Sequence, residues 1–171
     1  MCELSPNFLG WVGLNRGNHG SMVRINPFVG VHAIDVMTLC AKLEEERYVP
    51  GEIATYALHL GQLLPDELAF EFHVGESIAD EANGLAEHIA KTAVEYMKSV
   101  ADYDALLPLV EERMPMLGGY PERYAAILHL SGMAEEAREF VNGVLAQREG
   151  LARYSSDSFT RFGHNLLTIS G

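Results

Sequence analysis

Seven side chains that can make polar, ionic or aromatic contacts fall at alternating positions of four predicted strands. They are Trp11, Asn15, Arg24, Asn26, His59, Glu71 and His73. Successive side chains of a strand point to opposite faces of a sheet, so this spacing places the seven residues on one face. Tryptophan and arginine are frequent anchors of protein interfaces. We therefore expect this face to contact a partner protein.

The same residues allow two other kinds of chemistry. His59, Glu71 and His73 offer the imidazole and carboxylate groups that bind a metal ion, and Arg24 with protonated histidines offers an anion site. Both require His59 to lie opposite His73, which follows if a hairpin turn is centred near Asp66. A solvated face with no binding role is the third interpretation. The prediction retained is partner binding, with no metal, no cofactor and no catalytic residue.

The first strand pair is predicted at residues 8–15 and 22–32, on either side of the turn sequence RGNHGS. We expect the turn to be centred near residues 17–19. That register buries one face of the pair, made of Val12, Leu14, Val23 and Ile25.

A second strand pair is predicted at residues 55–62 and 70–74, after a helix at residues 33–47. Its apolar positions alternate with polar ones and comprise Leu58, Leu60, Phe70 and Phe72. The two pairs together form a mostly antiparallel sheet of about four strands.

The longest predicted element is a helix over residues 77–100. Its apolar residues recur every three or four positions, as in Leu85, Ile89, Ala93 and Met97, and so form one stripe. A helix of about 24 residues is about 36 Å long, enough to cover one face of a small sheet. Four further helices are predicted, at residues 102–114, from Pro121 to Ser131-Gly132, at residues 133–149, and after a cap at residues 155–157. The sequence therefore predicts one α+β domain over residues 1–171, with a strand-rich part at 1–75 and a helical part at 76–171.

The composition narrows the class of partner. The 171 residues carry a formal net charge of −12, with four basic and nine acidic side chains in residues 1–75 and eight and fifteen in the rest. Such a charge disfavours nucleic acid and anionic membranes and favours a basic partner. The sequence has no apolar run of membrane-spanning length and no signal-peptide pattern, so we expect a cytoplasmic protein. Its two cysteines form no disulfide framework or zinc set, and Cys40 is expected to be buried.

Sequence motifs give no support for an enzyme. The chain contains no GxSxG, GxxxxGK[ST] or GxGxxG pattern. The other histidines His32, His88, His129 and His164 lie on separate predicted elements, without metal-ligand spacing, and are expected to make local hydrogen bonds.

Three stretches resemble immunity-type proteins of α+β build, the small bacterial cytoplasmic antidotes to secreted polymorphic toxins. They read GWVGLNRG–SMVRINPFVGVH, ALHLGQLLPDELAFEF and LHLSGMAEEAREFV. The resemblance implies an acidic binding protein that neutralises a cognate toxin by occluding its active site. A basic toxin domain is the partner that the charge favours.

Two alternatives remain open on sequence grounds. One is a small metal-dependent or His/Glu-based enzyme that uses the face containing His59, Glu71, His73 and Arg24. The other is an adaptor that grips a peptide with a helical hairpin of tetratricopeptide type at residues 120–149. The oligomeric state does not follow from the sequence.

Overall fold

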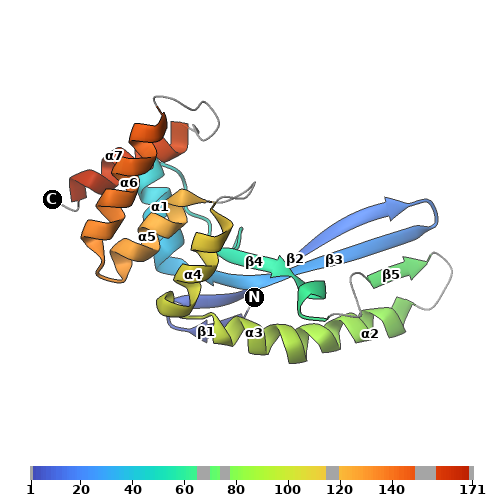
Figure 1. The fold of residues 1–171 in the computed structure, drawn as a ribbon. Coiled ribbons are helices and arrows are strands. Elements are labelled where there is room, and N and C mark those ends of the chain that lie inside the picture. The colour runs from blue at the N-terminus through green and yellow to red at the C-terminus, as the bar shows by residue number, and fades with distance from the viewer. Residues whose placement is uncertain (1, 65–69, 74–77, 115–119, 149–156, 170–171) are drawn as a thin grey trace.

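The computed structural model describes residues 2–64, 70–73, 78–114, 120–148 and 157–169. It has an α+β fold in which an antiparallel sheet is followed by a helical C-terminal half (Figure 1). The strands are β1 Cys2–Ser5, β2 Phe8–His19, β3 Met22–Ala33, β4 Tyr56–His59 and β5 Phe70–His73. Three residues of predicted elements lie outside the described ranges. They are residue 74 of the strand predicted at 70–74, and residues 155 and 156 of the predicted helix cap.

The sheet is built around β3, which pairs with β2 along its whole length. On its other edge, β3 pairs with β4 near one end and with β5 near the other. The prediction that β4 and β5 form a hairpin with each other is therefore wrong. Each short strand instead uses a different stretch of the long strand, Phe28–Val31 for β4 and Met22–Ile25 for β5.

The register of β2 with β3 also differs from the prediction. His19 pairs with Met22, and Gly20 has a φ of 64°, so the turn lies at Gly20-Ser21 instead of residues 17–19. A two-residue turn with glycine first is typical of type II′, which matches the twist of the adjoining strands. Leu14 consequently lies opposite Pro27, four residues from the predicted Val23.

The helices fall close to their predicted positions. They are α1 Ile34–Glu44, α2 Ile78–His88, α3 Val94–Ser99, α4 Tyr103–Arg113, α5 Pro121–Leu130, α6 Ala134–Arg148 and α7 Asp157–Ile169. A π-helical turn at Ile89–Ala93 joins α2 to α3, so the long helix predicted at 77–100 is confirmed as one rod over its described residues. None of the helices in the described ranges has the length and apolar character needed to cross a bilayer.

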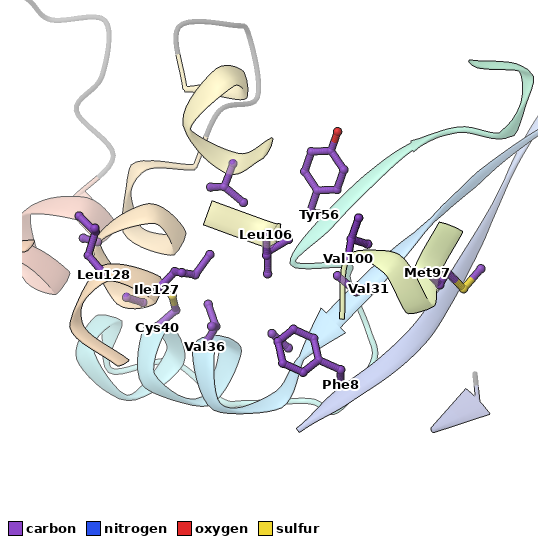
Figure 2. Close-up of a cluster of buried hydrophobic side chains, with 14 of the residues drawn as sticks. Phe8, Val31, Val36, Cys40, Tyr56, Met97, Val100, Leu106, Ile127 and Leu128 are labelled. Carbon is purple, nitrogen blue, oxygen red and sulfur yellow. The ribbon is translucent and has the colours of Figure 1, made fainter. Parts of the chain in front are cut away.

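The helices α1, α4, α5, α6 and α7 gather at one end of the sheet, and the far half of the β2–β3 hairpin extends away from them (Figure 1). We call residues 12–27 of this hairpin the arm. The main core lies between the near end of the sheet and the helices, where Phe8, Val36, Leu106 and Ile127 are almost fully buried (Figure 2). Cys40 belongs to this core, as predicted, and its burial raises the pKa of the thiol.

Candidate protein-binding surface

The seven predicted surface residues lie on one face of the sheet, which we call the polar face. Within β2 and β3, Trp11 and Asn15 alternate with Val12 and Leu14, and Asn15 lies opposite Asn26. The pairing of Arg24 with Glu71 brings β5 onto this face, and the pairing of Phe28 with His59 brings β4 onto it. The observed register of β2 with β3 differs from the predicted one by an even number of residues. Such a shift leaves every side chain on its predicted face of the sheet, because only an odd shift moves a side chain to the other face.

The long helix lies on the opposite face. A Cβ added to Gly10, which alternates with Trp11, would come within 2.9 Å of Met97 Sδ on α3. Val29, Val31 and Tyr56 share that side of the sheet and are buried. The apolar face is thus turned towards the long helix, which leaves the polar face on the other side of the sheet.

The polar face does not bring the two predicted histidines together. His59 lies opposite Phe28 and His73 lies opposite Met22, six positions along β3, a separation of about 20 Å. The predicted juxtaposition of His59 and His73 is therefore wrong. No group of three metal-ligating side chains with metal-site geometry occurs among the described residues.

The part of the polar face next to the helices is tied to the loop between α1 and β4. Trp11 Nε1 donates a hydrogen bond to Gly51 O at 3.1 Å, and the Trp11 ring lies over Gly13. Buried His32 lies 2.7 Å from Ile53 O through Nδ1, which must carry the proton because a carbonyl only accepts. Its Nε2 accepts from Gly51 N and lies 2.9 Å from the Tyr48 hydroxyl. These bonds fix the loop on the sheet and confirm a local role for His32.

The middle of the polar face contains unsatisfied polar atoms beside an aromatic contact. The rings of Phe28 and His59 lie 3.8 Å apart between centroids. Asn26 Oδ1 and His59 Nδ1 are buried without a hydrogen-bond partner in the structure. An unsatisfied buried polar atom is costly unless a water or a ligand supplies its partner.

The outer part of the polar face is open to solvent. Arg24 and Glu71 form a cross-strand ion pair, and Arg24 Nε donates to Glu71 Oε1 at 3.0 Å. Asn15 and His73 are exposed. An exposed pair of this kind contributes little to stability, about 0 to 1 kcal/mol, so these residues are free to serve another purpose at small cost to the fold.

The outer edge of β2 is a second feature of the arm. β1 covers this edge only from Phe8 to Gly10, and no described strand pairs with it over residues 12–18. Because His19 and Met22 close the two-residue turn, the odd-numbered residues of β2 bond to β3 and the even-numbered residues point outward. The N–H and C=O groups of Val12, Leu14, Arg16 and Asn18 therefore face solvent. We call this row the open edge.

The side chains of the open edge include an exposed leucine and no carboxylate. Leu14 was predicted to be buried, but it is 62% exposed because its true register places it beyond the part of the sheet packed on α3. Residues 8–33 contain Arg16 and Arg24 and no acidic residue, in a chain of net charge −12. Arg16 Nε donates to Asn18 Oδ1 along the strand at 3.0 Å.

A cluster of buried charges lies within the helical end of the molecule. Arg123 on α5 is 7% exposed and donates through Nη1 to Ala54 O and Thr55 O, at 2.9 and 3.0 Å. Burial raises the pKa of Glu122 to about 7, against the smaller lowering effect of Arg123. Burial also raises the pKa of Glu44 on α1. Neither Glu122 nor Arg123 was among the residues predicted from the sequence to have a functional role.

Replacing Glu122 by glutamine should remove a pH dependence of stability. Between its ordinary pKa of 4.5 and the folded value of about 7, the folded carboxyl binds more protons than the unfolded one. The wild-type free energy of unfolding therefore falls as the pH rises through this window. The stability of Glu122→Gln relative to wild type should rise by about 2 to 3 kcal/mol between pH 4 and pH 8 in urea denaturation.

Glu87 supplies the control for this experiment. Its side chain is exposed, and its hydrogen bond and charge interaction with Lys91 lower its pKa. Glu87→Gln should therefore change the pH dependence slightly and in the opposite direction. Parallel stability curves for Glu122→Gln and wild type from pH 4 to 8 would contradict the assignment.

Comparison with known proteins does not assign the chain to a family. No family model matches the chain, and neither the curated proteins nor the solved structures contain a match. The function is therefore inferred from the geometry of the chain and from the resemblance described above.

Proposed function

We propose that this protein is a cytoplasmic binding protein that neutralises a cognate toxin, as the immunity-type resemblance implies. The arm makes the contact in this proposal, through its open edge and the outer part of the polar face. Occlusion of the partner's active site then follows from insertion of a projecting hairpin. The protein itself performs no chemistry in this mechanism.

The observation that carries the proposal is the open edge of β2. Unpaired N–H and C=O groups along a strand accept a further strand from another chain, and natural proteins usually block such edges. Common blocking devices are proline, charged side chains, lysine above all, and inward-pointing charges. Residues 12–18 contain no proline and no lysine, Arg16 is their single charged side chain, and Leu14 has most of its surface exposed. Strand addition is a recurring mode of protein recognition, so this edge suits an extended segment of a partner.

The charge distribution supports long-range attraction of a basic toxin domain. The acidic side chains lie outside the β2–β3 hairpin, and their summed field raises the encounter rate with a basic protein. At short range, the contact depends on main-chain hydrogen bonds, which do not require opposite charge. The net charge and the arm therefore have separate roles, in association rate and in docking.

A proline on the open edge tests the proposal. Arg16→Pro removes an outward N–H and keeps the β2–β3 bonds, because residue 16 does not bond to β3. Arg16→Ala is the matched control, since it removes the charge and keeps the N–H. Immobilised wild-type protein should capture a partner from the native source, and Arg16→Pro should bind that partner at least about tenfold more weakly. Arg16→Ala should bind it within about threefold of wild type.

The captured partner must then be purified and assayed for toxicity. We expect an equimolar amount of wild-type protein to abolish that toxicity and Arg16→Pro to leave most of it. Equal binding by wild type and Arg16→Pro would overturn the role of the open edge. A captured partner that stays toxic in the complex would overturn neutralisation.

The alternative functions find less support in the geometry. The metal-dependent alternative needs His59 beside His73, and the strand pairing separates them. The adaptor alternative needs an open groove in the helical hairpin, but four consecutive residues of α5, Ala125–Leu128, are buried, and Tyr124 packs on Phe140 of α6. Both observations favour the arm as the contact region.

A further inference from the structure

A small cavity lies where β4 meets α4 and α5, on the helical end of the molecule and apart from the open edge. Its volume is about 80 Å³, and it is lined by Thr55 and Tyr56 of the sheet side and by Arg113, Tyr120 and Arg123 of the helix side. A water molecule occupies about 30 Å³, so the cavity accommodates a small group and is well below the size of a whole-metabolite pocket.

Two arginines make the lining of this cavity positively charged. The lining residues that the structure describes include Arg113 and Arg123 and no carboxylate. Arg113 Cζ lies 5.4 Å from the centre of the Tyr56 ring, and Arg123 Cζ lies 3.6 Å from the centre of the Tyr120 ring. Each guanidinium is thus held against an aromatic face, which limits the side-chain freedom that binding would otherwise remove.

The backbone fixes the second arginine further. Arg123 is buried, and its bonds to Ala54 O and Thr55 O hold one side of the guanidinium against the strand. A planar, permanently charged guanidinium in a fixed position suits the oxygens of a carboxylate or phosphate. Thr55, Tyr56 and Tyr120 also line the cavity and carry no charge that would oppose an anion.

We propose that this cavity is a binding site for an oxyanionic group, a carboxylate or a phosphate, held between Arg113 and Arg123. The site does not depend on the function proposed for the arm. Carboxylate and phosphate share the recognising chemistry, and titration with each anion separates them.

The test is direct titration of the full chain with sodium phosphate and, separately, with sodium acetate, at constant ionic strength set by sodium chloride. Calorimetry should show one saturable site for at least one of the anions, with a Kd of about 1 mM or tighter. Arg113→Gln should weaken that binding about tenfold or more, because it removes a charge-assisted hydrogen-bond donor. Arg113→Lys should bind with intermediate strength, since it keeps the charge and loses the planar fork.

Arg47→Gln is the control, because Arg47 is exposed in the loop after α1 and does not line the cavity. It should bind as wild type does. Saturation by acetate alone identifies a carboxylate site, and saturation by phosphate alone or by both identifies a site that accepts phosphate. An adventitious ion only, shown by equal affinity in wild type and Arg113→Gln, would overturn the proposal, as would no saturable binding of either anion. Circular dichroism of each variant establishes that it is folded before titration.

Discussion

Replacing Arg123 by alanine should lower the free energy of unfolding by about 3 to 5 kcal/mol. The change leaves the buried carbonyls of Ala54 and Thr55 without this donor, and it removes the cation beside Glu122 and Glu44. Breaking a buried charged network on one side is costly because the remaining groups stay desolvated. Urea denaturation at pH 7.5, followed by circular dichroism, measures the loss.

Arg47→Ala is the matched control for this substitution. Arg47 is exposed, and its replacement should change stability by no more than about 0.5 kcal/mol. A loss below about 1 kcal/mol for Arg123→Ala would show that the network contributes little to the fold. Adding Glu122→Gln to the Arg123 variant should recover part of the loss, because it removes the carboxylate left without its cation.

Gly30→Ala should also be strongly destabilising, by about 3 kcal/mol. A Cβ at this position would lie 1.9 Å from Tyr56 O and 2.6 Å from Ala57 Cα. Both atoms belong to the backbone of β4, so the clash is relieved only by separating β3 from β4 where Gly30 pairs with Ala57. Thermal and urea denaturation should both report the loss.

Gly84→Ala provides the contrast in the same chain. Gly84 lies inside α2, and an added Cβ there meets nothing within 4 Å. Alanine is favoured over glycine within a helix, so this variant should be more stable than wild type by about 0.5 to 1 kcal/mol. Equal and small effects of the two substitutions would contradict the close approach of β4 at Gly30.

The helices and the grouping of the polar face were predictable from local patterns. The apolar spacing of Leu85, Ala93 and Met97 identified the long helix, and Pro121 marked the first residue of α5. Strand alternation placed Trp11, Arg24 and Glu71 on one face, because face depends only on whether a position is odd or even. These signals depend on neighbours within a few residues.

The pairing of the strands was not predictable in the same way. The sequence RGNHGS offers several glycine and asparagine positions for a turn, and the observed one at Gly20-Ser21 allows all twelve residues of β2 to pair with β3. The division of one β3 edge between β4 and β5 depends on contacts between distant parts of the chain. The exposure of Leu14 and the gathering of Arg113 and Arg123 at one cavity follow from this tertiary arrangement. The available sequence signal for the cavity was the position of Arg113 and Arg123 on either side of the Pro/Gly-rich residues 115–121.

The π-helical turn at Ile89–Ala93, which joins α2 to α3, affects which side chains of this long helix face the sheet. In an uninterrupted α-helix, Leu85 and Met97 are twelve residues apart and would differ in direction by about 120°. Both are buried here. The wider π-helical turn between them has more residues per turn, which reduces this difference in direction. Deleting one residue from this turn would restore regular winding at the cost of misaligning one half of the rod with its strands. The length of this segment is therefore as constrained as its composition.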